Sequence, residues 1–148
     1  MPVNPRSEAR MGAFLRELAK NGVHAHHLSR SIYLVNSRKI SFRTTTKPGP
    51  KYWYDISKSI MDKVEYLIYQ TDTSHHFVLF PSSFFIKHYY DLQDSNRPDA
   101  KQFYIDWANK CLISDPRIDL NISEYCCSLY PNEEAGLWKK VLIKEHVS

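Results

Sequence analysis

Glycine is scarce in this chain, and its scarcity argues against several ways of holding a nucleotide. Only four glycines occur among 148 residues, and they form neither a P-loop nor the glycine-rich fingerprint of a dinucleotide-binding turn. The chain also lacks a serine flanked by glycines, the arrangement that exposes the nucleophile of α/β-hydrolases. Nucleotide-dependent chemistry is therefore disfavoured, although a catalytic triad built in another way stays open.

Cysteine is too rare to build a disulfide framework. The three cysteines are Cys111, Cys126 and Cys127, an odd number of which two are adjacent and therefore hard to pair with each other. We expect them to stay reduced, as in an intracellular compartment. Because nothing basic lies near Cys126 and Cys127 in sequence to lower a thiol pKa, we expect both to pack as small apolar side chains.

Long apolar runs are missing as well. No run approaches the roughly 20 residues that a membrane-spanning helix needs. The segment Met1–Arg10 is polar and interrupted by proline, unlike the charged start and apolar stretch of a signal peptide. We therefore expect a cytoplasmic protein with no membrane partner, folded as a single domain over residues 1–148.

Basic residues are concentrated in the first part of the chain. Residues 1–60 contain eleven Lys and Arg but only three Asp and Glu, a balance of +8, whereas the remaining residues have nine basic and thirteen acidic side chains, a balance of −4. Lys and Arg that neutralise phosphates release counterions and gain affinity whatever the base sequence. The asymmetry indicates a face for a nucleic-acid backbone; the alternative is a solvated basic surface without a partner.

The first element is predicted to be a helix that ends at Asn21-Gly22. Asn4 suits its cap and Pro5 its first helical position. The apolar residues at helical spacing are Met11, Phe14, Leu15 and Leu18. Three short strands are predicted to follow, at Val23–His27, Ile32–Val35 and Ile40–Thr44, with the last two joined across Asn36-Ser37.

The strand at Ile40–Thr44 carries both apolar and basic side chains. Because side chains alternate along a strand, Ile40 and Phe42 should face the core. Lys39, Ser41 and Arg43 should share the opposite face. One side of this hairpin is therefore predicted to be structural and the other chemical.

The later elements are read from turn residues and apolar runs. Thr44–Lys51 is predicted to be a loop because it contains Pro48-Gly49-Pro50. The next segment, Tyr52-Trp53-Tyr54, fits either an aromatic surface that touches DNA or an ordinary half-buried strand. Val64–Gln70 and Phe77–Phe80 are apolar enough for central strands. Helices are predicted from Pro81-Ser82 onwards, over Asp99–Leu112 and over Glu133–Ile143.

These elements predict an α/β (α+β) fold with one central mixed sheet of about five strands flanked by helices. Residues 1–95 would form the core, and residues 96–148 a helical C-terminal extension. The order of the elements resembles the restriction-endonuclease-like fold of the PD-(D/E)xK nucleases, nearest to small homing endonucleases and compact restriction enzymes. Most of the likeness lies in Lys39–Ser83, and the first helix adds to it.

The resemblance implies a metal-dependent DNA endonuclease. In that family, acids on the second and third strands hold a divalent metal, here Mg²⁺ or Mn²⁺, and a lysine two residues further on stabilises charge. The corresponding positions look like Ser31 or Tyr33, then Ser41 and Arg43, so neither acid is present. The candidate catalytic residues are therefore Arg43 and the nearby acids Glu8 and Asp55, with the two acids as metal ligands.

Double-stranded DNA is the expected partner. A homo-oligomer is expected as well, since two active sites are needed to cut both strands at once. The residues predicted to contact DNA are Arg30, Arg38, Lys39, Lys47, Lys51 and Trp53. Two alternatives stay open: a non-catalytic nucleic-acid-binding module on the same fold, which the missing acids favour, and a protein-interaction module, which the acidic, Tyr-rich second part would suit.

Overall fold

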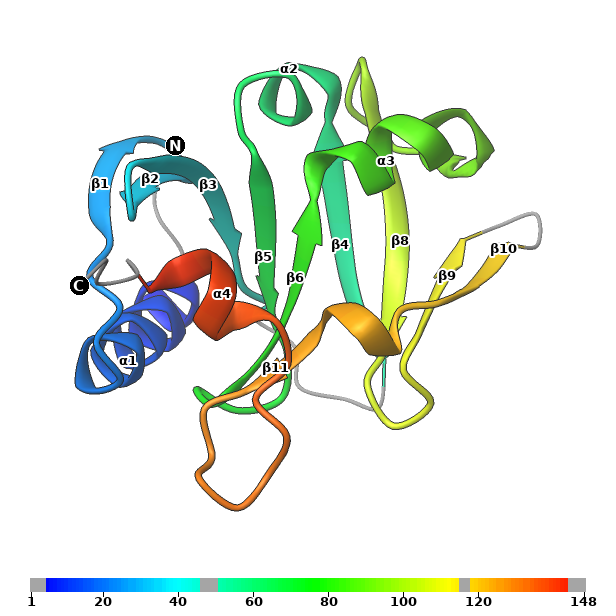
Figure 1. Cartoon of the computed structure of the whole chain (residues 1–148). Coiled ribbons are helices and arrows are strands. Elements are labelled where there is room, and N and C mark those ends of the chain that lie inside the picture. Colours follow the sequence, from blue (N-terminus) through cyan, green and yellow to red (C-terminus); the bar gives the residue numbers. More distant parts are fainter. Residues whose placement is uncertain (1–4, 46–50, 115–117, 144–148) are drawn as a thin grey trace.

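Two sheets form the framework of the protein (Figure 1). The computed structural model describes residues 5–45, 51–114 and 118–143. The first sheet has six strands, in the order β1 (His26–Ser29), β2 (Ile32–Val35), β3 (Arg38–Arg43), β5 (Tyr66–Gln70), β6 (His76–Pro81) and β11 (Cys126–Ser128). The second sheet has the order β10 (Ile118–Asn121), β9 (Cys111–Ser114), β8 (Ala100–Asp106) and β4 (Lys51–Ser57), with β7 (Gln93–Asp94) paired to β8.

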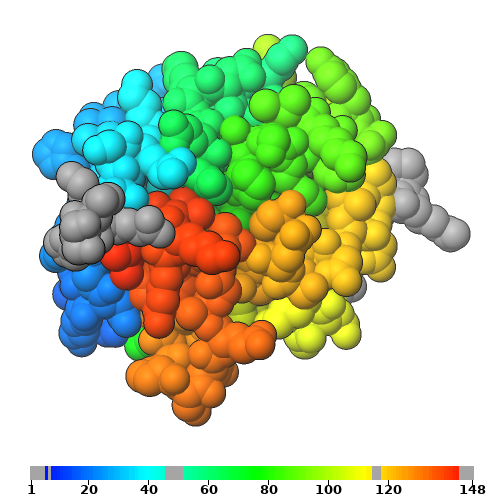
Figure 2. Space-filling view, in the orientation of Figure 1, coloured from blue at the N-terminus to red at the C-terminus, as the bar shows by residue number. Residues whose placement is uncertain are grey.

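The first and last helices cover one face of the first sheet, and the second sheet covers the other, together with the two short helices between them. The α-helices in the described ranges are α1 (Pro5–Lys20), α2 (Lys58–Met61), α3 (Ser82–His88) and α4 (Trp138–Leu142), and 3-10 turns cover Tyr89–Asp91 and Ser123–Tyr125. Side chains of α1 and α4 share one core with the first sheet, and the red segment around α4 lies close to the blue α1 in Figure 2. None of the described helices is long and apolar enough to cross a membrane.

Strand β6 shows how the two cores are separated. Phe77 and Leu79 point to the core shared with α1 and α4, whereas Val78 and Phe80 point to the core between the two sheets. Because successive side chains of a strand face opposite ways, a strand buried on both faces must be apolar throughout. The prediction of a central strand from the apolar run Phe77–Phe80 is confirmed.

The predicted helix and meander are confirmed. Phe14 and Leu18 of α1 are fully buried, and β1, β2 and β3 pair in antiparallel order. Asn36 and Ser37 have φ of 52° and 64°, as required by the two-residue turns that match the twist of a hairpin. The first strand begins later than predicted, at His26.

The connection between β3 and β5 links the two sheets. β3 and β5 pair in parallel, so the chain must cross over between them. The crossover contains β4, which pairs antiparallel with β8 and forms one edge of the second sheet. The aromatic segment Tyr52-Trp53-Tyr54 is therefore a strand of the second sheet rather than of the first.

The prediction of a helix over Asp99–Leu112 is wrong. This segment forms β8, a turn and β9, so the helical character expected for residues 96–148 is largely wrong as well. Phe103 and Ile105 alternate with Tyr104 and face Tyr54 and Tyr52 of β4. These cross-strand aromatic pairs stabilise the strand and override the apolar spacing that suggested a helix.

The general α+β class is confirmed. The prediction of a single sheet of about five strands is wrong, because the described residues form two sheets, of six and five strands. The last helix is also shorter than the predicted Glu133–Ile143 and begins at Trp138. Gly136 has a φ of 81°, a left-handed conformation that a helix cannot contain. The helix that follows Pro81 is confirmed as α3.

Candidate functional site

A cavity of about 600 Å³ opens at the end of β3. Ile32 of β2 pairs with Ser41, so Phe42 and Arg43 extend past the end of β2. We call this hollow the β3 cavity. Its polar lining is Glu8 of α1, Arg30 and Ser31 of the β1–β2 turn, Arg43 and Thr44 at the end of β3, and Ser57 and Arg97 near the second sheet.

Asp55 lies beside the β3 cavity between two guanidinium groups. Its Oδ1 is 3.0 Å from Nη2 of Arg43, and its Oδ2 is 2.5 Å from Nη2 of Arg97. The side chain of Asp55 is only 10% exposed, whereas those of Arg43 and Arg97 are 39% and 57% exposed. A carboxylate this buried needs such partners, because an unpaired charge away from water is costly.

The two contacts of Asp55 differ in kind. Arg97 donates a hydrogen bond to Oδ2, but the contact of Arg43 with Oδ1 is an ion pair that lacks hydrogen-bond geometry. Oδ1 is shielded from solvent and accepts no hydrogen bond from the described residues. The strand places Asp55 here because its neighbours Tyr54 and Ile56 face the core between the sheets, so the alternating side chain turns outward.

Hydroxyl groups stand where the resemblance calls for acids. The Oγ atoms of Ser31 and Ser41 are 3.1 Å apart, and Ser41 is fully buried. The hydroxyl of Thr44 donates to Oε1 of Gln70 at 2.6 Å and accepts from Nε of Arg10 at 3.3 Å. These hydroxyls are engaged with one another or with Gln70, so the guanidinium groups are the donors that this region can offer to an oxyanion.

An aromatic wall completes the cavity. The ring centroid of Tyr33 lies 4.8 Å from that of Phe42 and 4.8 Å from that of His27, and all three side chains line the cavity. Burial raises the pKa of Tyr33 above its ordinary value of 10.0. The phenol therefore stays protonated at neutral pH and can donate a hydrogen bond.

The described residues do not fit the divalent metal that the resemblance implies. A Mg²⁺ or Mn²⁺ site needs several oxygen ligands with negative charge. Within the described ranges no group of three His, Cys, Asp or Glu side chains is placed to hold an ion. Both oxygens of Asp55 face arginines, which leaves Glu8 as the only acid among the described lining residues.

The structure brings together part of the predicted site. Glu8, Arg30 and Arg43 line the same cavity, and Asp55 contacts Arg43. These four residues come from three elements and the β1–β2 turn, and the three candidate catalytic residues are all among them. Their convergence at one place was predicted only through the resemblance.

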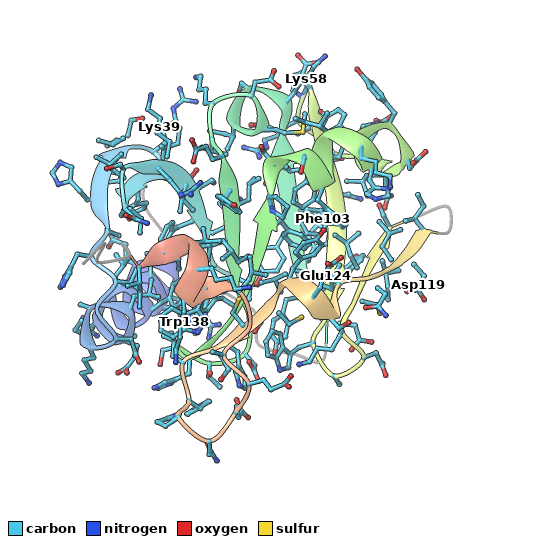
Figure 3. The ribbon with its side chains drawn as sticks, viewed as in Figure 1. Lys39, Lys58, Phe103, Asp119, Glu124 and Trp138 are labelled. Atoms are coloured by element: carbon cyan, nitrogen blue, oxygen red, sulfur yellow. The ribbon has the colours of Figure 1, made fainter. Side chains whose placement is uncertain are left out.

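The other predicted DNA contacts lie elsewhere. Arg38 and Lys39 are at the opposite end of β3, and Arg38 pairs with Glu65 at 3.2 Å. Lys39 lies at the edge of the molecule, away from Phe103 in the interior (Figure 3). Trp53, which is 45% exposed, stands beside Tyr104 on the outer face of the second sheet. Lys47 and the side chain of Lys51 lie outside the described residues.

Arg97 is the residue that sequence reasoning missed. It lies between β7 and β8, in the acidic second part of the chain, where no DNA contact was predicted. The local sequence Ser95-Asn96-Arg97-Pro98 indicates a turn, but a turn signal does not say where an arginine will reach. Its role depends on the pairing of β8 with β4, which brings the turn beside Asp55.

The comparisons with known proteins give no match. No family model matches this sequence. No curated protein and no solved structure is similar to it at a significant level.

Proposed function

We propose that the chain is a nucleic-acid-binding module that holds backbone phosphates of DNA at the β3 cavity without hydrolysing them. The observation that carries the proposal is the arrangement of Asp55 between Arg43 and Arg97. Arginine is well suited to phosphate, because its planar group donates two parallel hydrogen bonds. Each guanidinium has five N–H donors and uses only part of them on Asp55.

The charge around the cavity supports this proposal. Arg30, Arg43 and Arg97 line it, with Glu8 as the one described acid on its wall. Binding of this kind is driven by the release of counterions and weakens steeply with salt.

The topology supports a restriction-endonuclease-like fold as part of the proposal. The meander and the strands β5 and β6, which carry the resemblance, belong to one mixed sheet, and the first helix packs on it. The acids expected on the second and third strands are replaced by hydroxyl groups at Ser31 and Ser41. A fold of this class that has lost its metal ligands would keep the surface that binds DNA and lose the chemistry.

Fluorescence anisotropy with a labelled duplex of 30 base pairs, measured from 50 to 300 mM KCl, tests the binding proposal. We expect Arg97→Ala to weaken binding equally for unrelated base sequences and to lower the slope of log Kd against log salt by about 1. Lys140→Ala is the matched control, since Lys140 is exposed on α4 and does not line the cavity. Binding that does not respond to salt, or equal effects of the two variants, would contradict the proposal.

A metal-dependent endonuclease is the second candidate. It is favoured by one observation, the convergence of Glu8, Arg43 and Asp55 at one cavity. Incubation with supercoiled plasmid and genomic DNA in Mg²⁺ or Mn²⁺ separates the two candidates. Cleavage that needs metal and disappears in Glu8→Ala or Asp55→Ala would replace the non-catalytic proposal, whereas intact DNA with salt-sensitive binding would support it.

A further inference from the structure

The two sides of the β3 cavity differ in chemistry. Because side chains alternate along a strand, Tyr33 and Phe42 face α1, whereas Arg43 faces the second sheet. The wall on the α1 side contains Glu8, Met11, Tyr33 and Phe42. The wall on the side of the second sheet contains Arg43, Ser57, Ile60 and Arg97. The cavity is therefore aromatic and acidic on one side and cationic on the other.

The cationic side suits a phosphate group. Arg43 and Arg97 are fixed at one Nη atom by Asp55, which orients both guanidinium groups while leaving other N–H donors unused. The hydroxyl of Ser57 accepts from the backbone N–H of Ile60 at 3.3 Å and lies 3.4 Å from the hydroxyl of Ser59. Two oriented guanidinium groups and a hydroxyl make a better anion site than mobile surface lysines would.

The aromatic side suits a nucleobase. The ring of Tyr33 is partly buried against His27 and the buried Phe42, and it gives an apolar surface on which a base can stack. The carboxylate of Glu8, exposed in the first turn of α1, can accept a hydrogen bond from a base amino group. The same carboxylate repels a phosphate, which favours the orientation that places the phosphate on Arg43 and Arg97.

We propose that the β3 cavity binds one unpaired nucleotide of a DNA strand, with its phosphate on Arg43 and Arg97 and its base against Tyr33 and Glu8. This inference rests on the proposed DNA binding. The volume of about 600 Å³ lies within the range of sites that enclose a small molecule. A base that is paired and stacked in a duplex cannot reach such a wall, so the nucleotide must come from a strand end or be extruded from the helix.

Three labelled DNA molecules of equal paired length test this proposal by anisotropy. The first is a dumbbell, a duplex whose two ends are each closed by a non-nucleotide linker, so that every base is paired. The second is an open duplex with a single 5′-phosphorylated overhanging nucleotide. The third is the capped dumbbell with one extra unpaired nucleotide in its centre. We expect the second or the third molecule to bind at least tenfold more tightly than the first, and the one that does so identifies the source of the nucleotide.

Variants assign the preference to the cavity. We expect Glu8→Ala and Tyr33→Leu to bring the ratio of the affinities for the unpaired nucleotide and for the closed dumbbell close to one, whatever the change in absolute affinity. Arg97→Ala should weaken binding of all three molecules, and Lys140→Ala should change none. Glu8 is exposed, so its substitution tests the wall without disturbing the core.

The possible failures are distinguishable. Equal salt-sensitive binding of the three molecules overturns the inference and leaves the proposed function standing. Absence of salt-sensitive binding to any of them overturns both. A preference that persists in Glu8→Ala and Tyr33→Leu also overturns the inference, because the unpaired nucleotide then binds elsewhere.

Discussion

Arg97 and Asp55 are 42 residues apart in sequence, yet Nη2 of Arg97 donates a hydrogen bond of 2.5 Å to Oδ2 of Asp55. The other oxygen of Asp55 faces Arg43, which belongs to the first sheet. The carboxylate therefore contacts both Arg43 of the first sheet and Arg97 of the β7–β8 turn in the second sheet. It also sets how much positive charge the β3 cavity presents to an anion.

Substitution of Asp55 by asparagine should strengthen DNA binding and weaken the fold. The amide keeps the shape of the side chain but removes the negative charge that offsets Arg43 and Arg97. We expect affinity to rise about threefold at 100 mM KCl and the salt dependence to become steeper. The free energy of unfolding should fall by about 1–2 kcal/mol, a value discounted because both arginines are partly exposed.

Anisotropy titrations and urea unfolding of Asp55→Asn measure the two effects. Asp62→Asn is a suitable control, because Asp62 is an exposed acid outside the β3 cavity. Weaker binding by Asp55→Asn in a folded protein would mean that the carboxylate orients the arginines more than it neutralises them.

Gly136 should tolerate no side chain. Its φ is 81°, and a Cβ there would lie 2.5 Å from the carbonyl oxygen of Cys126. Gly22 has a similar φ of 84°, but a Cβ there meets nothing within 4 Å. We expect Gly22→Ala to cost about 1 kcal/mol from backbone strain alone and Gly136→Ala clearly more, about 3 kcal/mol or above.

Thermal and urea unfolding of the two variants measure these losses. Gly22→Ala reports the cost of backbone strain alone, and Gly136→Ala reports the cost of strain together with a steric clash. Equal losses of stability would show that the segment before α4 moves away from β11 at little cost.

Glu133 should contribute to stability at neutral pH and lose that contribution in acid. The Oγ of Ser128 and the Nε2 of His76 each lie 2.7 Å from Oε1 of Glu133. These two hydrogen bonds, with that of Ser128 the larger cause, lower the pKa of Glu133 from its ordinary value of 4.5. A carboxyl whose folded pKa lies below its unfolded pKa stabilises the fold above the unfolded value, and this stabilisation is lost as the pH falls through the folded value.

Melting temperatures between pH 7 and pH 3 test this expectation. Glu133→Gln should start lower at pH 7 and fall less steeply below pH 4.5 than the parent chain, because the amide has no proton to gain. Glu134→Gln, at an exposed neighbouring position, should follow the parent curve. Parallel curves for the parent and Glu133→Gln would show that these hydrogen bonds do not contribute.

Truncation of Phe103 should cost much more stability than truncation of Tyr104, because the two side chains lie on opposite faces of β8. Phe103 is fully buried and its ring lies 5.2 Å from that of Tyr69, whereas Tyr104 is 37% exposed. Phe103→Ala should cost about 3–5 kcal/mol of unfolding free energy. Tyr104→Ala should cost about 1 kcal/mol or less. Similar losses at both positions in urea unfolding would argue against the strand.

Local patterns predicted strands β1, β2, β3, β5 and β6 of the first sheet but not β11. The periodicity of α1, the Asn36-Ser37 turn and the apolar runs of β5 and β6 are each set by neighbours in sequence. The second sheet was missed because β8 is defined by its partner β4, and the apolar residues Phe103 and Trp107 happen to be spaced like a helix. Such a pairing depends on contacts across about fifty residues, which a local pattern does not contain.

The same distinction applies to the site. Glu8, Arg43 and Asp55 were predicted because the order of elements resembled a known fold, and they do converge. Arg97 was missed because its position depends on the second sheet. The missing acids at Ser31 and Ser41 were visible in the sequence, but the pairing of Asp55 with two arginines required the structure.

The crossover that contains β4 makes the two sheets depend on each other for folding. A strand inserted between β3 and β5 belongs to the second sheet, so neither sheet is a continuous stretch of sequence that could be cut out and folded alone. A fragment of residues 1–95 would leave the seven residues of β4 without β8 and expose Tyr52, Tyr54 and Ile56 to water. Loss of either sheet would also separate Arg43 from Arg97, so binding of DNA and global unfolding should share one midpoint in urea.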